Sequence, residues 1–125
     1  MKMLLVDVKN CVVKPVDVNG LDDYYDLIGC RCIDIVNRRI GKRRFEIICD
    51  DEGLLVDKPI MSAVSYMGEP MLMGNLLIAG GEVIDGELTP ITDVEIEYIK
   101  EFMFDVLDLN DENRVIVHKV VMMNW

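Results

Sequence analysis

Few residues in this sequence have the types and spacing that catalysis requires. His118 is the one histidine, and it lies in an apolar run near the end of the chain. A lone histidine in such a run is more often a strand residue than a general base. Neither Ser62 nor Ser65 lies in the turn that exposes a nucleophilic serine, and no phosphate-binding Gly-x-x-x-x-Gly-Lys loop occurs. We therefore expect no enzymatic activity, no catalytic residues and no cofactor.

The four cysteines are the nearest approach to a metal site. Cys30 and Cys32 would point to one face of a strand, and Cys49 would lie on the neighbouring strand. A thiolate zinc site needs four ligands, and the fourth would have to be Cys11 or His118. Because both are distant in sequence, we expect reduced, buried structural thiols and no bound metal. Reduced thiols also suit a cytoplasmic protein.

A basic cluster is the sharpest local feature. It comprises Arg38, Arg39, Lys42, Arg43 and Arg44, in a segment that is expected to be the tip of a hairpin between residues 37 and 44. Arginines there could bind phosphate groups through forked contacts. They could equally be a charged turn that protects the edge of a sheet. The net charge of −10 opposes direct binding of nucleic acid.

Acidic residues are concentrated in the second half of the chain. Residues 1–44 hold nine Lys or Arg and six Asp or Glu, whereas residues 45–113 hold two and seventeen. A solvated surface is the simplest interpretation. If these carboxylates instead bind a partner, the candidates are Asp50, Asp51, Glu52, Glu82, Asp85, Glu87, Glu97, Glu101, Asp105 and Asp108.

Two helices are expected to support these residues. The clearer one covers residues 92–108, where Thr92 and Glu95 have the spacing of a capping box and Ile91 and Ile96 that of a hydrophobic staple. Its apolar stripe contains Ile96, Ile99, Met103 and Val106. The other covers residues 21–28 and ends at Gly29.

Short apolar and alternating runs predict the strands. A hairpin is expected from residues 3–8 and 11–18, with Pro15 confining the second run to an edge. Further strands are expected at 31–37, 45–50, 54–56, 76–79 and 114–123. Residues 57–73 show no period and are expected to form a long Met-rich loop. The chain is thus predicted to be one α+β domain over residues 1–125, with a mixed, mainly antiparallel sheet of about five to seven strands and two helices packed on it.

Membrane insertion and secretion are not expected. No run approaches the ~20 apolar residues that a spanning helix needs. The N-terminal segment loses its apolar character after a few residues and has no small-residue cleavage site, unlike a signal peptide.

Several segments resemble a known family. They are Met-Lys-Met-Leu-Leu-Val-Asp at residue 1, Asp-Leu-Ile-Gly-Cys-Arg-Cys-Ile-Asp near residue 30, Glu-Ile-Ile-Cys-Asp-Asp-Glu-Gly-Leu-Leu, Gly-Asn-Leu-Leu-Ile-Ala-Gly and Leu-Thr-Pro-Ile-Thr-Asp-Val-Glu-Ile-Glu-Tyr. The family is domain of unknown function 3846, which contains small proteins common on bacterial plasmids, conjugative elements and phages. The resemblance covers about residues 1–103, so that 104–125 form a C-terminal extension. It implies no catalytic residues.

Three functions are compatible with these observations. The first is a non-enzymatic accessory protein of a mobile element or phage, which binds and inhibits a host protein such as a nuclease or defence protein by presenting carboxylates in place of phosphates. The second is an oligomer that binds a phosphorylated small ligand, such as a nucleotide messenger, through the basic cluster. The third is an enzyme, for which no set of base, nucleophile and metal is found. We expect the first.

Overall fold

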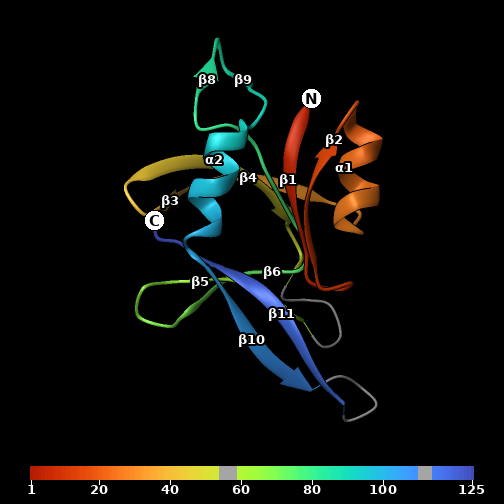
Figure 1. Cartoon of the computed structure of the whole chain (residues 1–125). Helices are drawn as coiled ribbons and strands as arrows, with labels where there is room; N and C mark the ends of the chain where they lie inside the picture. The colour runs from red at the N-terminus through yellow and green to blue at the C-terminus, as the bar shows by residue number, and fades with distance from the viewer. Residues whose placement is uncertain (54–58, 110–113) are drawn as a thin grey trace.

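The structure is a computed structural model that describes residues 1–53, 59–109 and 114–125. Its elements, in chain order, are β1 (Lys2–Asp7), β2 (Val12–Asp17), α1 (Leu21–Ile28), β3 (Ile33–Ile40), β4 (Arg43–Asp50), β5 (Met61–Val64), β6 (Pro70–Met73), β7 (Leu76–Ile78), β8 (Val83–Ile84), β9 (Glu87–Leu88), α2 (Asp93–Lys100), β10 (Met103–Leu109) and β11 (Val115–Met122). Figure 1 shows their arrangement. The predicted α+β class is confirmed, but the strands are divided among three sheets instead of one.

The large sheet has the strand order β2-β1-β7-β4-β3, and all its neighbouring strands are antiparallel. β7 lies at its centre, where Leu77 pairs with Leu5 on one side and with Ile48 on the other. All three residues of β7 are buried, which explains why the sequence there is a continuous apolar run without alternation. Pro15 lies on the edge strand β2, as predicted, where its missing N–H costs no sheet hydrogen bond.

One face of the large sheet packs against α1. The residues buried between them are Met3, Leu5, Val18, Ile28, Ile48, Leu77 and Ala79. α1 ends as predicted at Gly29, which has a φ of 76° and whose N–H donates to the Tyr25 carbonyl at 2.8 Å. Because a residue with a side chain is disfavoured at positive φ, glycine suits this position.

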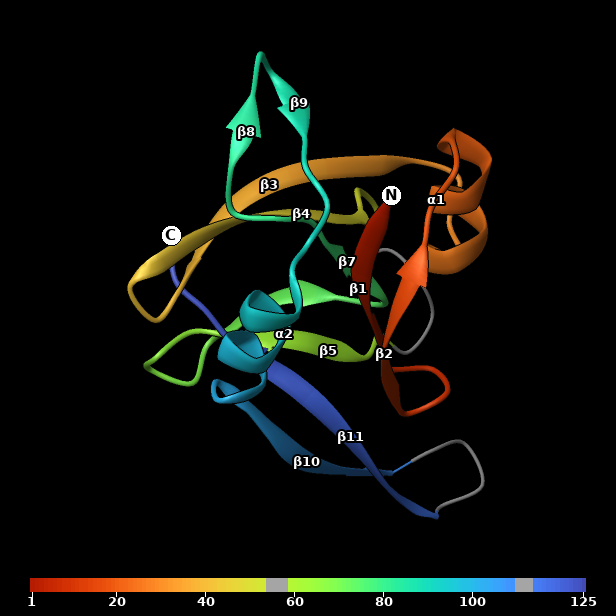
Figure 2. The same ribbon diagram turned by 45° about the horizontal axis from the view of Figure 1, so that its top comes forward.

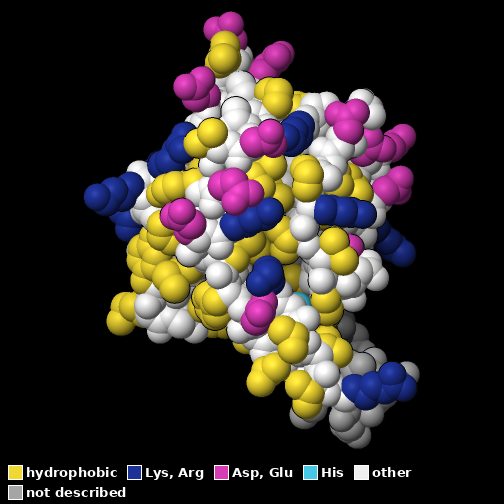
Figure 3. All heavy atoms as spheres, in the orientation of Figure 1, with side chains coloured by type: hydrophobic (Ala, Val, Ile, Leu, Met, Phe, Trp, Pro, Cys, Tyr) yellow, Lys and Arg dark blue, Asp and Glu magenta, His cyan; other side chains and the backbone are white. Residues whose placement is uncertain are grey.

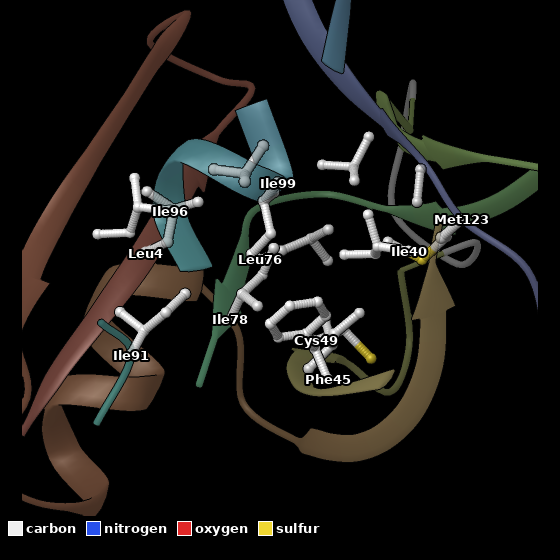
Figure 4. Close-up of a cluster of buried hydrophobic side chains, with 14 of the residues drawn as sticks. Leu4, Ile40, Phe45, Cys49, Leu76, Ile78, Ile91, Ile96, Ile99 and Met123 are labelled. Atoms are coloured by element: carbon white, nitrogen blue, oxygen red, sulfur yellow. The ribbon is translucent and has the colours of Figure 1, made fainter. Parts of the chain in front are cut away.

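The opposite face packs against α2 and part of the small sheet. Figure 4 shows Ile96 and Ile99 of α2 meeting Leu4 and Leu76 of the large sheet. The predicted capping box is present: the Thr92 hydroxyl accepts from the Glu95 N–H at 3.1 Å, and the Glu95 carboxylate accepts from the Thr92 N–H at 3.0 Å. The helix predicted over residues 92–108 is therefore confirmed in its first half.

The small sheet has the order β10-β11-β5-β6. Its β10–β11 hairpin is antiparallel and extends away from the rest of the molecule in both Figure 1 and Figure 2, whereas β11 and β5 are parallel. Asn124, the second residue after the hairpin, connects the two sheets. The N–H of Asn124 donates to the Arg39 carbonyl at 2.7 Å, and the N–H of Arg39 donates to the Asn124 carbonyl at 2.8 Å.

The predicted helix over residues 92–108 is wrong in its second half. α2 ends at Lys100, and β10 begins at Met103. Residues 103–109 pair over their whole length with the β-branched run of β11. Long-range pairing thus overrides a helical period that continues only through Met103 and Val106.

The predicted Met-rich loop is also partly wrong. Residues 61–64 and 70–73 form β5 and β6, whose pairing is interrupted by register shifts. The two strands have four residues each and an irregular register, and successive residues of β5 are buried. Their sequences therefore lack the alternation of apolar and polar residues that predicts a strand. The short strand predicted at 54–56 lies outside the described residues. Among the residues that are described, no helix is long and apolar enough to cross a membrane.

Candidate functional site

The β8–β9 hairpin forms a narrow projection, which we call the acidic finger and define as residues 81–88. Figures 1 and 2 show it extending from the body beyond α2. Its turn is made by Asp85 and Gly86, with φ values of 53° and 77°. Two successive residues of positive φ are the pattern of a two-residue hairpin turn, and Asp-Gly is a preferred sequence for it. The segment is therefore a hairpin with a two-residue turn.

The finger combines negative charge with exposed apolar surface. Glu82, Asp85 and Glu87 are exposed, and so are Val83 and Ile84, at 47% and 58% of their full surface. The apolar pair was missed from the sequence, although its place directly before the Asp-Gly turn signal would have located it. A rigid projection with both kinds of side chain can enter a groove in a partner protein.

The buried carboxylate of Glu95 fixes the base of the finger to α2. Besides its bond to the Thr92 N–H, it accepts from the Gly81 N–H at 2.7 Å. A further backbone bond joins the Gly80 N–H to the Thr89 carbonyl at 2.9 Å. The finger is thus held in one orientation relative to the helix.

The ten predicted carboxylates do not form one continuous acidic surface. Figure 3 shows acidic side chains over the finger and α2, with basic side chains between them. Glu97 lies 3.6 Å from the Lys100 ammonium, and Asp105 accepts a hydrogen bond from Lys119 at 2.7 Å on the β10–β11 hairpin. The structure places Glu82, Asp85 and Glu87 on the finger, Glu97 on α2 with Glu101 at its C-terminal end, and Asp105 and Asp108 on β10.

The remaining three predicted carboxylates, Asp50, Asp51 and Glu52, lie at the far end of β4. They line a pocket of about 450 Å³ together with Arg38 and Cys49. β4 is eight residues long, so Asp50 at its end lies roughly 23 Å from Arg43 at its start. Burial, reinforced by the charge of Asp34, raises the pKa of the Cys49 thiol to about 11. The thiol is protonated at neutral pH and is a poor nucleophile there.

The predicted basic tip is smaller than expected, because strands β3 and β4 continue into it. Only Gly41 and Lys42 remain as the turn. The turn is bonded to α2: the Lys42 N–H donates to the Tyr98 hydroxyl at 2.8 Å, and that hydroxyl donates to the Ile40 carbonyl at 2.9 Å.

The arginines of the tip have intramolecular contacts. The Arg38 guanidinium lies 4.1 Å from the centre of the Trp125 ring, and Arg43 lies 5.3 Å from that of Tyr98. Arg44 donates to the Asn37 amide oxygen at 2.8 Å and to the Trp125 carbonyl at 3.0 Å. Most of this cluster therefore holds the C-terminal residues and α2 in place.

Arg39 and Arg44 are directly opposite each other on β3 and β4. Like charges at such positions repel, since their Cβ atoms are about 5 Å apart. The Nε of Arg39 is shielded from water and has no hydrogen-bond partner. An anion between the two guanidinium groups would offset their repulsion and would accept a hydrogen bond from the Arg39 Nε.

The cysteines and the histidine do not converge on a metal site. Cys30 and Cys32 precede β3 instead of lying in it, and all four thiols are unpaired. Only Cys49 is buried, so the expectation of buried structural thiols is wrong for Cys11 and Cys32, which are exposed. Among the described residues, no three His, Cys, Asp or Glu side chains are grouped to hold a metal ion.

His118 is a strand residue, as predicted, and is almost fully buried in β11. Its Nε2 lies 3.1 Å from the Met61 carbonyl, which can only accept, so Nε2 carries the proton. Its Nδ1 has no partner. Within the described part of the chain, His118 has no hydrogen bond to a carboxylate, which a catalytic histidine usually has as its orienting group.

Comparison with known proteins gives one match. A family model with the description "Domain of unknown function (DUF3846)" matches residues 1–103. Neither the search of curated proteins nor the search of solved structures finds a match. The matched part includes both helices, the large sheet and the finger, and it ends at the first residue of β10. The chain therefore belongs to the DUF3846 family, with residues 104–125 as an addition beyond the matched region.

Proposed function

We propose that this protein is a non-enzymatic binding protein that inserts its acidic finger into a basic groove of a partner protein and thereby inhibits it. The partner class that fits is a nucleic-acid-binding protein, such as a nuclease or defence protein of a bacterial host. The observation that carries the proposal is the finger itself, a projecting hairpin with three carboxylates around an exposed apolar pair.

The charges of the finger suit a groove that normally binds phosphates. Residues two apart on a strand lie about 7 Å apart, so the finger offers closely spaced negative charges on a narrow body. Complementary charge accelerates association and orients the two proteins as they meet. Val83 and Ile84 would then be removed from water in the complex, and buried apolar groups at the centre of an interface supply most of its affinity.

The attachment of the finger favours tight binding. Glu95 and the Gly80–Thr89 backbone bond fix its base. A hairpin that is already ordered loses little conformational entropy on binding, so more of the contact energy appears as affinity.

Charge substitution in the finger tests the proposal. A tagged chain is used to isolate its partner from host lysate, and association rates are then measured with the purified partner. The finger variant carries Glu82→Lys, Asp85→Asn and Glu87→Lys, the asparagine being chosen because it tolerates positive φ. We expect its association rate to fall at least about tenfold, and added salt to slow the unmodified protein as well.

A matched control separates a local effect from a change of net charge. Asp22→Lys, Asp26→Asn and Glu69→Lys change the charge by the same amount at exposed positions outside the finger. The association rate of this variant should fall about threefold or less, because distant charges are screened by salt. Equal losses for the two variants, or none for the finger variant, would contradict the proposal.

A second candidate function is favoured by the Arg39–Arg44 pair, namely binding of a phosphorylated small ligand. The unpaired Arg39 Nε and the opposed guanidinium groups support it. Replacing both arginines with Gln should then abolish binding of a nucleoside diphosphate, whereas Arg43→Gln should not. If the finger variant binds normally and the double arginine variant does not, this second function replaces the first.

A further inference from the structure

The two larger sheets have four edges, and three of them carry features that hinder pairing with another chain. β2 contains the exposed Pro15. β3 is bonded near its end to Asn124. β6 has four residues, begins with Pro70 and pairs irregularly. Short strands, prolines and irregular pairing are the usual protections of sheet edges.

β10 has none of these protections. It is seven residues long, contains no proline, glycine or lysine, and pairs with β11 in an unbroken register. Among the described strands, β11 is its only neighbour, so its other side is open. Such an edge is a template for a further strand.

The direction of the β10 hydrogen bonds follows from one observed bond. The Met122 N–H donates to the Phe102 carbonyl at 2.8 Å, and the register places these two residues opposite each other. Because bonded pairs alternate along an antiparallel ladder, residues 104, 106 and 108 bond to β11. The backbone groups of residues 103, 105, 107 and 109 therefore point toward the open side.

The same strand exposes apolar side chains. Leu107 is opposite Val117 on β11, and the two expose 72% and 48% of their surface. Val115, farther along β11, exposes 64%. Figure 3 shows hydrophobic side chains gathered over this hairpin. Leu107 and Val117 thus form an exposed apolar row across the hairpin. This row ends at the edge of β10, where the backbone groups face no neighbouring strand among the described residues.

We propose that β10 is a dimerisation strand, which pairs antiparallel with β10 of a second copy of this chain about a two-fold axis at Leu107. In this register, residues 105, 107 and 109 exchange about six backbone hydrogen bonds with the second copy. The small sheets of the two copies become one continuous sheet. The row Val117–Leu107 is then extended by Leu107 and Val117 of the other copy.

The charges of β10 favour this occupant and this register. A two-fold axis at Leu107 places Asp105 opposite residue 109 of the other copy, so the two Asp105 carboxylates do not face each other. Asp105 is in addition paired with Lys119 of its own sheet. A second copy also supplies a strand of matching length and an apolar row of the same width, and most soluble homo-oligomers are two-fold dimers of this kind.

Measurement of mass in solution tests the dimer. Size-exclusion chromatography with light scattering, over a series of concentrations, should give twice the chain mass of 14.3 kDa. Leu107→Lys should raise the dimer dissociation constant at least about tenfold, because it places two like charges at the axis. Leu107→Pro should do the same by removing an outward N–H that β11 does not use. Circular dichroism verifies that both variants are folded.

Val94→Lys is the matched control. Val94 exposes 75% of its surface on α2, slightly more than Leu107, but it is not on the edge. This variant should remain dimeric. The mass of a single chain at all concentrations would overturn the proposal. An equal increase of the dimer dissociation constant in Val94→Lys and Leu107→Lys would also overturn it.

Cross-linking tests the register. Paired residues of an antiparallel ladder have Cα atoms about 5.5 Å apart, which a disulfide can span. Leu107→Cys should therefore form a bond between residues 107 of two copies on oxidation, identified by mass spectrometry because Cys11 and Cys32 are also exposed. A dimer without this bond would overturn the register.

Discussion

Glu95 stabilises two parts of the structure, although its place in a capping box predicts only one. Its two carboxylate oxygens accept from the Thr92 and Gly81 N–H groups, and its side chain is nearly buried. One residue therefore caps α2 and also fixes the base of the acidic finger. The first of these bonds is predictable from the Thr-x-x-Glu spacing. The second is not, because Gly81 is fourteen residues away and approaches only in the folded chain.

We expect Glu95→Ala to destabilise the protein by about 2 kcal/mol, since two partly buried N–H groups lose their acceptors. Thr92→Ala, which removes the other half of the box, should cost about 1 kcal/mol. Urea denaturation measures both. Glu97→Ala is the control on the same helix, and its exposed side chain should change stability by less than about 0.5 kcal/mol. If Glu95→Ala costs no more than Thr92→Ala, the bond to the finger contributes nothing.

At the scale of elements, the contact between α2 and the β3–β4 turn determines where the basic residues lie. Gly41 has a φ of 63°, and a Cβ atom there would overlap the Tyr98 hydroxyl and the Phe102 ring. The turn is therefore pressed against the helix, and Tyr98 bonds to both sides of it. The predicted free hairpin tip is therefore a two-residue turn that is packed against α2.

Gly41→Ala should cost clearly more stability than the same change at Gly74. Both glycines have positive φ, so both substitutions carry a backbone cost of about 1 kcal/mol. Only at Gly41 would the new methyl group displace two aromatic side chains, since nothing lies within 4 Å of the corresponding position at Gly74. We expect a difference of at least about 2 kcal/mol in the free energy of unfolding, measured by denaturation. Equal costs would show that the turn is not packed against α2.

The predicted elements show which signals in the sequence are local. The capping box, the Gly29 stop and the β1–β2 hairpin are set by neighbouring residues, and all three are confirmed. Residues 103–109 fit both a helical stripe and a strand, and only the distant β11 decides between them. The opposition of Arg39 and Arg44 depends on the register of β3 and β4, which a sequence does not state. The site was therefore predictable as a set of charges but not as an arrangement.

At the scale of the whole molecule, the two sheets form one body through a shared core and a short C-terminal connection. Asn124 exchanges two backbone bonds with Arg39, and Trp125 lies under the Arg38 guanidinium. Residues beyond the matched family region thus return to the large sheet. The finger and β10 project from this body at separate places, as Figure 2 shows. The proposed partner binding and the proposed dimer would therefore use separate surfaces.

This connection should make unfolding a single cooperative event. Trp125 is the one tryptophan, so its fluorescence reports on the C-terminal connection alone, whereas far-ultraviolet circular dichroism reports on all strands. In a two-state protein the two transitions coincide.

Asn124→Pro removes the N–H that donates to Arg39, and an unmade backbone bond costs about 1 kcal/mol. In this variant the fluorescence change should precede the loss of circular dichroism, because Trp125 is released first. Val115→Ala, at an exposed position far along the hairpin, should leave the two transitions coincident. Separate transitions in the unmodified protein would mean that the C-terminal residues are not part of the cooperative unit, and that the two sheets are held together by the core alone.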